Sequence, residues 1–483
     1  MTSTVTLPTW LFVILAALAA WALLERLLVP GVRWYLRRKV NRVIREIGTR
    51  LNIELPQFKL TRRQALIDRL FHDPKVQDAI ARECRDKSLP REVVAARVDR
   101  CAREIVPAFN AYFYFRIAYW LSKRLATLLY RVRVGYVDST ALAAVNPRSS
   151  VVFVMNHRSN MDYVLVAFLA SERVALSYAV GEWARIWPLQ QLIRSMGAYF
   201  VRRNSGDALY RMVLQRYVQM AVEAGVPQAV YPEGGLTVDG RLRPPRLGLL
   251  DYMLKAFDPA AERDIVFIPV GINYDRVLED RTLLLKLDSA APRRGVLYAA
   301  ARTAAFVGSN LWLALTGRWH RFGYACVNFG TPLSMRDYVR SQGVDFRRLD
   351  EQARHREVER VGMQVMEAIA RIVPVLPVSL VATVFLARRD AGLSELELKS
   401  AAYELILRLE KAGAHIYVPR GDLDYAIGVG LRMLLLRRIV VEEDGLYRAI
   451  PAEAALLAYY ANAIGPLVAA AGGLQAVPAA RAA

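Results

Sequence analysis

The stretch Val151–Asp162, VVFVMNHRSNMD, decides the fold that we predict for this chain of 483 residues. Its first five residues are apolar and mostly β-branched, which is typical of a short buried strand. Ser159 and Asp162 have the spacing of a capping box, and the apolar run YVLVAFLA that follows is typical of a helix. The stretch therefore predicts a strand, a polar turn and a helix, in that order.

His157 lies in the predicted turn, and Asp162 lies in the first turn of the predicted helix, where the helix dipole favours an ionised carboxylate. Such a carboxylate can accept the N–H of one imidazole nitrogen and leave the other nitrogen as a base. This is the arrangement of a catalytic triad without its serine, so the proton would come from the substrate. The alternative is a histidine that only satisfies the turn.

Other predicted strands also end in polar residues. Strands alternate with helices from Val134 to about Tyr338, and three of them read GAYFVRR, AVYPEGG and IVFIPVGINY. Open α/β sheets place their ligand sites at the ends of strands. We therefore predict an α/β domain over residues 134–340, with a mixed sheet flanked by helices and a site at one edge of that sheet.

The rest of the chain is predicted to be helical. Leu7–Leu24 carries no charge and a dense basic segment follows it, so residues 1–30 are predicted to form a transmembrane anchor. A helix that dips into one leaflet is the alternative. Residues 31–133 are predicted to form a basic helical region, and residues 341–475 a helical C-terminal region. The aromatic cluster Asn110–Trp120 fits either a membrane interface or a helix packed on the next domain. An apolar run within residues 300–316 is too short to span and is predicted to be interfacial or buried.

The charge balance indicates an anionic partner. The chain has 66 Lys and Arg against 45 Asp and Glu, a formal net charge of +21. Nucleic acid and anionic lipid both fit such a charge, but no nucleic-acid motif is visible, which favours lipid. The three cysteines are widely spaced, and no Gly-rich phosphate loop, HExxH motif or Rossmann fingerprint is present. We therefore expect no metal and no cofactor.

Four blocks, NHRSNMD, GAYFVRR, YPEGG and FIPVGINYD, resemble the four sequence blocks of the glycerolipid acyltransferase superfamily. They are most similar to the membrane-bound glycerol-3-phosphate acyltransferases of bacteria and mitochondria, as are the stretches GYACVNFGTPLS and LLAYYANAI. The resemblance covers about residues 134–467. It implies transfer of a fatty acyl group from acyl-CoA or acyl-carrier protein to the sn-1 hydroxyl of glycerol 3-phosphate. The basic segment that follows Leu24 predicts, by the positive-inside rule, that the catalytic domain lies on the cytoplasmic face of the inner membrane.

The resemblance also assigns roles to residues. It makes His157 the general base and Asp162 the residue that orients it, without a covalent acyl-enzyme. The substrate-binding residues that we expect from it are Arg158, Arg203, Glu233, Gly234, Arg246 and Pro269.

The third block departs from the family pattern. The family continues EGxRSRxGK, whereas this chain reads EGGLTVDGR, so Leu236 and Val238 replace two arginines. Arg241, Arg243 and Arg246 are the cations that can replace them. The departure keeps two alternatives open: a lysophospholipid or other O-acyltransferase with a different acceptor, and a non-catalytic lipid-binding protein.

Overall fold

The computed structural model describes residues 57–170, 176–181, 189–202, 205–287, 312, 321–388 and 392–473. The predicted anchor, most of the apolar run at 300–316 and Arg203 lie outside these described residues. Among the residues that are described, no helix combines the length and the apolar character needed to cross a bilayer.

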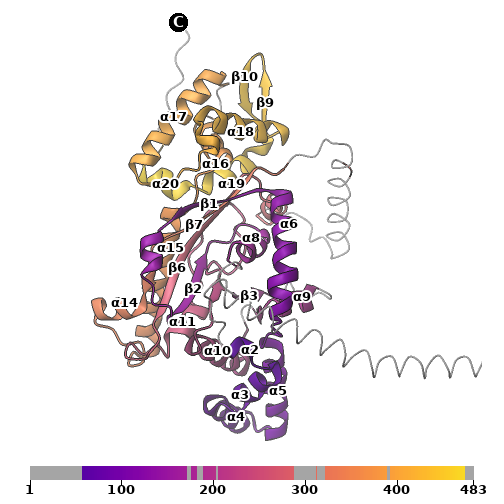
Figure 1. The fold of residues 1–483 in the computed structure, drawn as a ribbon, viewed down its shortest axis with the longest axis vertical. Coiled ribbons are helices and arrows are strands. Elements are labelled where there is room, and N and C mark those ends of the chain that lie inside the picture. The colour runs from indigo at the N-terminus through magenta and orange to yellow at the C-terminus, as the bar shows by residue number, and fades with distance from the viewer. Residues whose placement is uncertain are drawn as a thin grey trace, which may run out of the picture.

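A mixed sheet of eight strands forms the centre of the molecule (Figure 1). Seven strands follow the order β1-β7-β6-β2-β5-β3-β4, and β8 pairs with β6. Neighbouring strands are parallel from β6 to β4, whereas β7 and β8 run antiparallel to β6. The predicted mixed sheet with flanking helices is therefore confirmed. The strands are β1 (Arg131–Val137), β2 (Ser150–Met155), β3 (Ser177–Gly181), β4 (Tyr199–Val201), β5 (Gln228–Val230), β6 (Ile265–Tyr274), β7 (Tyr324–Phe329) and β8 (Leu333–Ser334).

Side chains of β2 alternate between two cores, as a pleated strand requires. Val152 and Val154 belong to one buried cluster, whereas Val151 and Phe153 pack against the other. The first cluster is covered by α3 (Arg63–Phe71), α4 (Pro74–Lys87), α5 (Arg91–Ile105), α10 (Ala208–Glu223), α11 (Gly248–Leu254), α14 (Met335–Gln342) and α15 (Glu351–Ile372). The second is covered by α8 (Met161–Ala170) and by helices near the C-terminal end of the chain.

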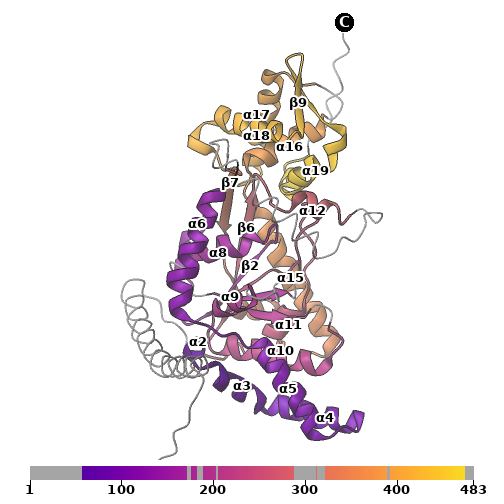
Figure 2. The ribbon, with the colours of Figure 1, turned by 90° about the vertical axis from the view of Figure 1, so that its right-hand side faces the viewer.

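The helices α16 (Pro377–Ala387), α17 (Glu395–Lys411), α18 (Leu423–Leu436), α19 (Ala454–Asn462) and α20 (Gly465–Ala470) gather at one end of the molecule (Figures 1 and 2). The predicted cap of α17 is present, because Ser394 and Glu397 form both halves of a capping box. The structure adds an antiparallel hairpin of β9 (Val440–Glu443) and β10 (Leu446–Ala449), which we did not predict. Its turn residues Asp444 and Gly445 both have positive φ, the conformation that an Asp-Gly turn supplies.

The remaining helices are short or lie at the edge of the sheet. A π-helical turn, η1 (Phe113–Ala118), continues directly into α6 (Tyr119–Leu129), which packs against α8. The others are α2 (Gln57–Leu60), α7 (Ser139–Ala143), α9 (Leu189–Ser195), α12 (Asp280–Leu284), η3 (Pro419–Gly421) and η4 (Pro451–Glu453).

Candidate active site

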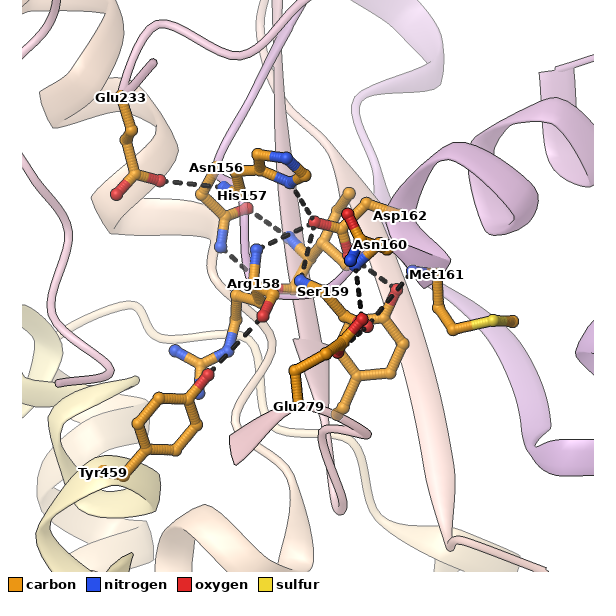
Figure 3. Close-up of polar contacts among 12 residues, drawn as sticks. Asn156, His157, Arg158, Ser159, Asn160, Met161, Asp162, Glu233, Glu279 and Tyr459 are labelled. Carbon is orange, nitrogen blue, oxygen red and sulfur yellow. Dashed lines mark hydrogen bonds and ion pairs between the residues drawn. The ribbon is translucent and has the colours of Figure 1, made fainter. Parts of the chain in front are cut away.

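His157 follows the carboxyl end of β2 and contacts Asp162 directly. Its Nδ1 lies 2.8 Å from Oδ2 of Asp162, and the two side chains are 3% and 0% exposed. Figure 3 shows the second ring nitrogen pointing away from the carboxylate. The structure thus brings the two predicted residues together in the orientation in which Nε2 remains the basic nitrogen.

Hydrogen bonds hold both oxygens of Asp162. Oδ2 also accepts from the backbone N–H groups of Arg158 at 2.8 Å and Ser159 at 3.1 Å. The Ser159 bond is one half of the predicted capping box. In the other half the Ser159 hydroxyl accepts from Met161 N instead of Asp162 N, at 3.1 Å. A carboxylate with this many donors has a fixed orientation, and so has the imidazole that it binds.

Tyr274, the last residue of β6, supplies the partner of the other Asp162 oxygen. Its hydroxyl donates to Oδ1 at 2.7 Å. Burial, together with the neighbouring Asp162 charge, raises the pKa of Tyr274 well above its ordinary value, so the phenol remains a donor. Tyr274 lies within the fourth block, but its role was missed because its neighbour in space is 112 residues away in sequence.

Asn156 fixes the start of the turn. Its side-chain amide donates to Ile272 O at 2.9 Å, and its side-chain oxygen accepts from Ile272 N at 2.7 Å. The side chain therefore takes the place of a backbone partner and extends the β2–β6 ladder by one step. His157 begins immediately after this fixed point.

Glu233 holds the backbone of the His157 turn. Its Oε1 accepts from His157 N at 2.8 Å, and its Oε2 accepts from Arg243 N at 3.0 Å. Burial raises the pKa of Glu233 to about 7, although both backbone hydrogen bonds oppose that rise. Because backbone donors occupy both oxygens, Glu233 holds the His157 turn in place and joins the third block to the first.

Gly234 allows Arg246 to lie across the third block. Gly234 has φ of +69°, and a Cβ there would come within 2.3 Å of Cδ of Arg246. The Arg246 backbone is held by a 2.7 Å hydrogen bond from its N–H to Pro232 O. The glycine is therefore required both by its backbone conformation and by the close approach of this arginine.

Arg158 is buried but directed away from the imidazole. Its Nη1 donates to Gly240 O at 2.9 Å, and its guanidinium carbon lies 5.1 Å from the centre of the Tyr459 ring. Figure 3 shows the guanidinium on the Tyr459 side of the turn. Its Nε and Nη2 are buried without a hydrogen-bond partner in the described part of the chain. Buried donors of this kind are rare and mark a place for a ligand or a water molecule.

Two further contacts hold the turn and were not predicted. Glu279 accepts from the Ser159 hydroxyl at 2.7 Å and from Asn160 N at 3.1 Å, and burial raises its pKa. The His157 ring stacks on Tyr231, with ring centres 4.2 Å apart and planes inclined by 28°. Glu279 thus holds the residues that follow His157, and Tyr231 restricts movement of the imidazole itself.

Other expected substrate contacts are placed differently. Pro269 is buried within β6 opposite Val154, and its carbonyl accepts from Gly330 N at 2.9 Å. Leu236 and Val238 are partly buried and pack against the core, so they do not form a polar site. Arg203 lies outside the described residues.

A cavity of about 240 Å³ lies away from the expected site residues. It is lined by residues including Ser150 and Ile265, at the amino ends of β2 and β6, opposite to the end that carries His157. Within the described residues, no group of three His, Cys, Asp or Glu side chains is arranged to hold a metal ion.

The chain is similar to known acyltransferases over most of its length. A model of the acyltransferase family matches residues 137–273, and a model of the glycerol-3-phosphate acyltransferase C-terminal region matches residues 310–476. The glycerol-3-phosphate acyltransferase of Pseudomonas putida KT2440 is 28% identical over 423 residues, which are 83% of this chain and 48% of that protein. The protein of the same name from Actinobacillus succinogenes is 27% identical over 446 residues, 89% of this chain and 52% of that protein.

The chain spans about half the length of these curated relatives. Among solved structures, the 1-acyl-sn-glycerophosphate acyltransferase of Thermotoga maritima matches 52% of this chain and 78% of its own, at 18% identity. Its TM-score of 0.31 is too low to establish a shared fold. The two family models and the named relatives show that the chain is similar to glycerol-3-phosphate acyltransferases.

Proposed function

We propose that this protein transfers a fatty acyl group from acyl-CoA or acyl-carrier protein to the sn-1 hydroxyl of glycerol 3-phosphate, forming lysophosphatidate. The observation that carries the proposal is the 2.8 Å contact between His157 Nδ1 and an Asp162 carboxylate that is fully hydrogen-bonded. The similarity to glycerol-3-phosphate acyltransferases supports the same chemistry.

In the proposed mechanism Asp162 keeps the imidazole proton on Nδ1, and Nε2 of His157 accepts the proton of the acceptor hydroxyl. The hydroxyl oxygen bonds to the carbonyl carbon of the thioester, and the carbonyl oxygen becomes an oxyanion. When the intermediate collapses, the carbon–sulfur bond breaks and the thiol takes the proton from His157. The acyl group passes directly to the acceptor, so no serine or cysteine nucleophile is needed.

We propose that arginines hold the phosphate of the acceptor. Arg246 lies across Gly234 in the third block, and Arg158 has two buried N–H groups without partners in the described part of the chain. A guanidinium suits a phosphate because it donates two parallel hydrogen bonds. Arg203 is proposed for the same role on its match to the second block. Exchange of Arg246 for Gln should raise KM for the phosphorylated acceptor and leave KM for the acyl donor unchanged.

A different acceptor is the second candidate, and Leu236 and Val238 favour it. These residues pack on the core where the family pattern has two arginines. A site with fewer cations fits an acceptor that presents less negative charge, such as a lysophospholipid.

The decisive experiment gives the purified full chain labelled acyl-CoA and acyl-carrier protein with a panel of acceptors. We expect lysophosphatidate from glycerol 3-phosphate, and a loss of about 10²–10⁴-fold in His157→Ala, the usual contribution of a general base. His355→Ala, which changes an exposed histidine of α15, is the matched control. Product formed from lysophospholipids alone would show that a lysophospholipid is the acceptor and not glycerol 3-phosphate. Full activity of His157→Ala would exclude the proposed mechanism.

We also propose that the protein works on the cytoplasmic face of the inner membrane, with residues 1–30 as its anchor and anionic lipid as a partner. The net charge of +21 and the uncharged run Leu7–Leu24 support this location. The residue ranges 31–133, 134–340 and 341–475 remain our proposal for its domains.

A further inference from the structure

The continuous helix formed by η1 and α6 has one face made for packing. Its buried positions recur at every fourth residue, namely Tyr114, Ala118, Ser122 and Ala126. The last three are small, which allows α6 to lie close against α8. In Figures 1 and 2, α6 lies on the far side of α8 from the sheet, at the outside of the molecule.

The opposite face of the helix is apolar and exposed. We call it the α6 outer face, and its members Ile117, Trp120, Leu121, Leu125 and Leu128 are between 37% and 58% exposed. Their spacing of three and four residues places them along one stripe of the helix. Large apolar side chains gathered in this way mark an interaction surface, whereas single exposed ones are ordinary.

Basic residues flank the α6 outer face, and the η1–α6 helix carries no acidic residue. Arg116, Lys123 and Arg124 are exposed, and residues 113–129 contain no Asp or Glu. The Arg124 guanidinium lies 5.6 Å from the centre of the Trp120 ring, and Lys123 Nζ lies 5.6 Å from that of Tyr119. Long basic side chains of this kind can reach headgroups while their neighbours enter the acyl region.

We propose that the α6 outer face docks on an anionic lipid surface, with the helix lying in the plane of the interface. Leucine and tryptophan next to Lys and Arg are the composition of interfacial helices. A helix of 17 residues from 113 to 129 is about 25 Å long, too short to cross a bilayer but able to lie along one. The net charge of +21 favours anionic over zwitterionic lipid.

This inference rests on the proposed function. Acyl chains and lysolipid products partition into membranes, so an enzyme that handles them benefits from docking on a membrane. The helix behind α6 is α8, whose first turn carries Asp162. A membrane in contact with α6 would therefore be one helix layer away from the helix that orients His157.

A local probe tests the docking independently of any anchor in the same chain. Full-length protein carrying Leu128→Cys and Cys84→Ser is labelled with an environment-sensitive fluorophore and reconstituted into phosphatidylcholine vesicles with or without 30% phosphatidylglycerol. We expect blue-shifted emission that lipids spin-labelled near the headgroup quench, more strongly with phosphatidylglycerol. Adding Lys123→Glu and Arg124→Glu should remove the preference for the anionic lipid.

The matched control carries the label at Leu407→Cys, an equally apolar side chain that is 65% exposed on α17, and it should respond to neither lipid. Quenching at position 128 by aqueous iodide to the same extent as at 407 would overturn the proposal. Blue-shifted emission without quenching by lipid would also overturn it, since another part of the protein would then cover this face. Acyl transfer measured on the same samples with His157→Ala separates the two proposals, because that variant should lose activity and keep its lipid quenching.

Discussion

The hydroxyl of Tyr274 donates a 2.7 Å hydrogen bond to Oδ1 of Asp162, so β6 holds the carboxylate that holds the imidazole of His157. Asp162 is completely buried, and Tyr274 is the partner of the one oxygen that the turn itself does not bind. Orientation of the His157 imidazole therefore depends on the register of two neighbouring strands, β2 and β6.

Tyr274→Phe should lower kcat about 10-fold or more, since a buried carboxylate oxygen without its donor costs about 1–3 kcal/mol. The pH profile of kcat should also move, because the environment of the His157–Asp162 pair changes. Tyr130→Phe is the control: its hydroxyl donates to Arg276 O at 2.8 Å, and its ring lies 5.2 Å from that of Tyr274. Equal losses of kcat in the two variants would mean that Tyr274 acts through stability alone.

Gly234→Ala should abolish most activity even where the protein folds. The added methyl group would displace Arg246, and the positive φ would add about 1 kcal/mol of strain. Gly413→Ala provides the comparison, because Gly413 has φ of +78° with open space around it and tests the strain alone. Kinetic constants and melting temperatures of both variants check this, and wild-type KM and kcat in Gly234→Ala would contradict it.

Arg158→Met should raise KM for the acceptor about 10-fold or more, the effect of losing one charge-assisted contact, without lowering the melting temperature. Stability should hold because the lost hydrogen bond to Gly240 O is offset by removal of a buried cation whose Nε and Nη2 have no partner in the described part of the chain, and methionine has a similar length. Arg437→Met is the contrast, since Arg437 donates to Asp280 at 2.6 Å and its loss leaves a buried carboxylate. A fall in melting temperature with unchanged KM in Arg158→Met would show that Arg158 only clamps the turn.

The raised pKa of Asp275 leads us to expect that the free energy of unfolding depends on pH. Burial raises its pKa from 3.8 to about 7, against hydrogen bonds from Tyr324 N at 2.7 Å and Val378 N at 3.1 Å. Between these pH values the folded state holds a proton that the unfolded state has released, so the contribution of Asp275 to stability falls as pH rises from about 4 to about 7.

Asp275→Asn should therefore flatten the decline of the melting temperature over that pH range. Part of the decline should remain, because the pKa of Glu233 is also raised to about 7. Asp337→Asn, which changes an exposed residue of α14, should keep the wild-type slope. An unchanged slope in Asp275→Asn would contradict the prediction.

The sequence was sufficient to predict contacts within one local element. The His157–Asp162 contact spans five residues, and the geometry of a strand, a turn and a helix cap is enough to form it. The Ser394–Glu397 capping box was predicted for the same reason. The sequence also contains an Asp444-Gly445 pair, which is typical of a hairpin turn. We overlooked this pair and therefore did not predict the β9–β10 hairpin.

The supports of the site could not be predicted, because they depend on the order of the strands. Glu233, Tyr274 and Glu279 reach the His157 turn from 76, 112 and 120 residues away. Their positions follow from β2 lying between β5 and β6, which no spacing in the sequence encodes. Arg158 shows the same limit, since its neighbour Tyr459 comes from α19, in the second of the two matched regions.

Tyr459 and Asn462 of α19 reach back to the first half of the chain, where the Tyr459 ring covers Arg158 and the Asn462 amide donates to Asp239 O at 2.9 Å. The two matched regions are therefore not separable modules. A protein truncated before α19 would lose the Tyr459 ring that covers Arg158 in the His157 turn. We therefore expect the two matched regions to have been inherited together.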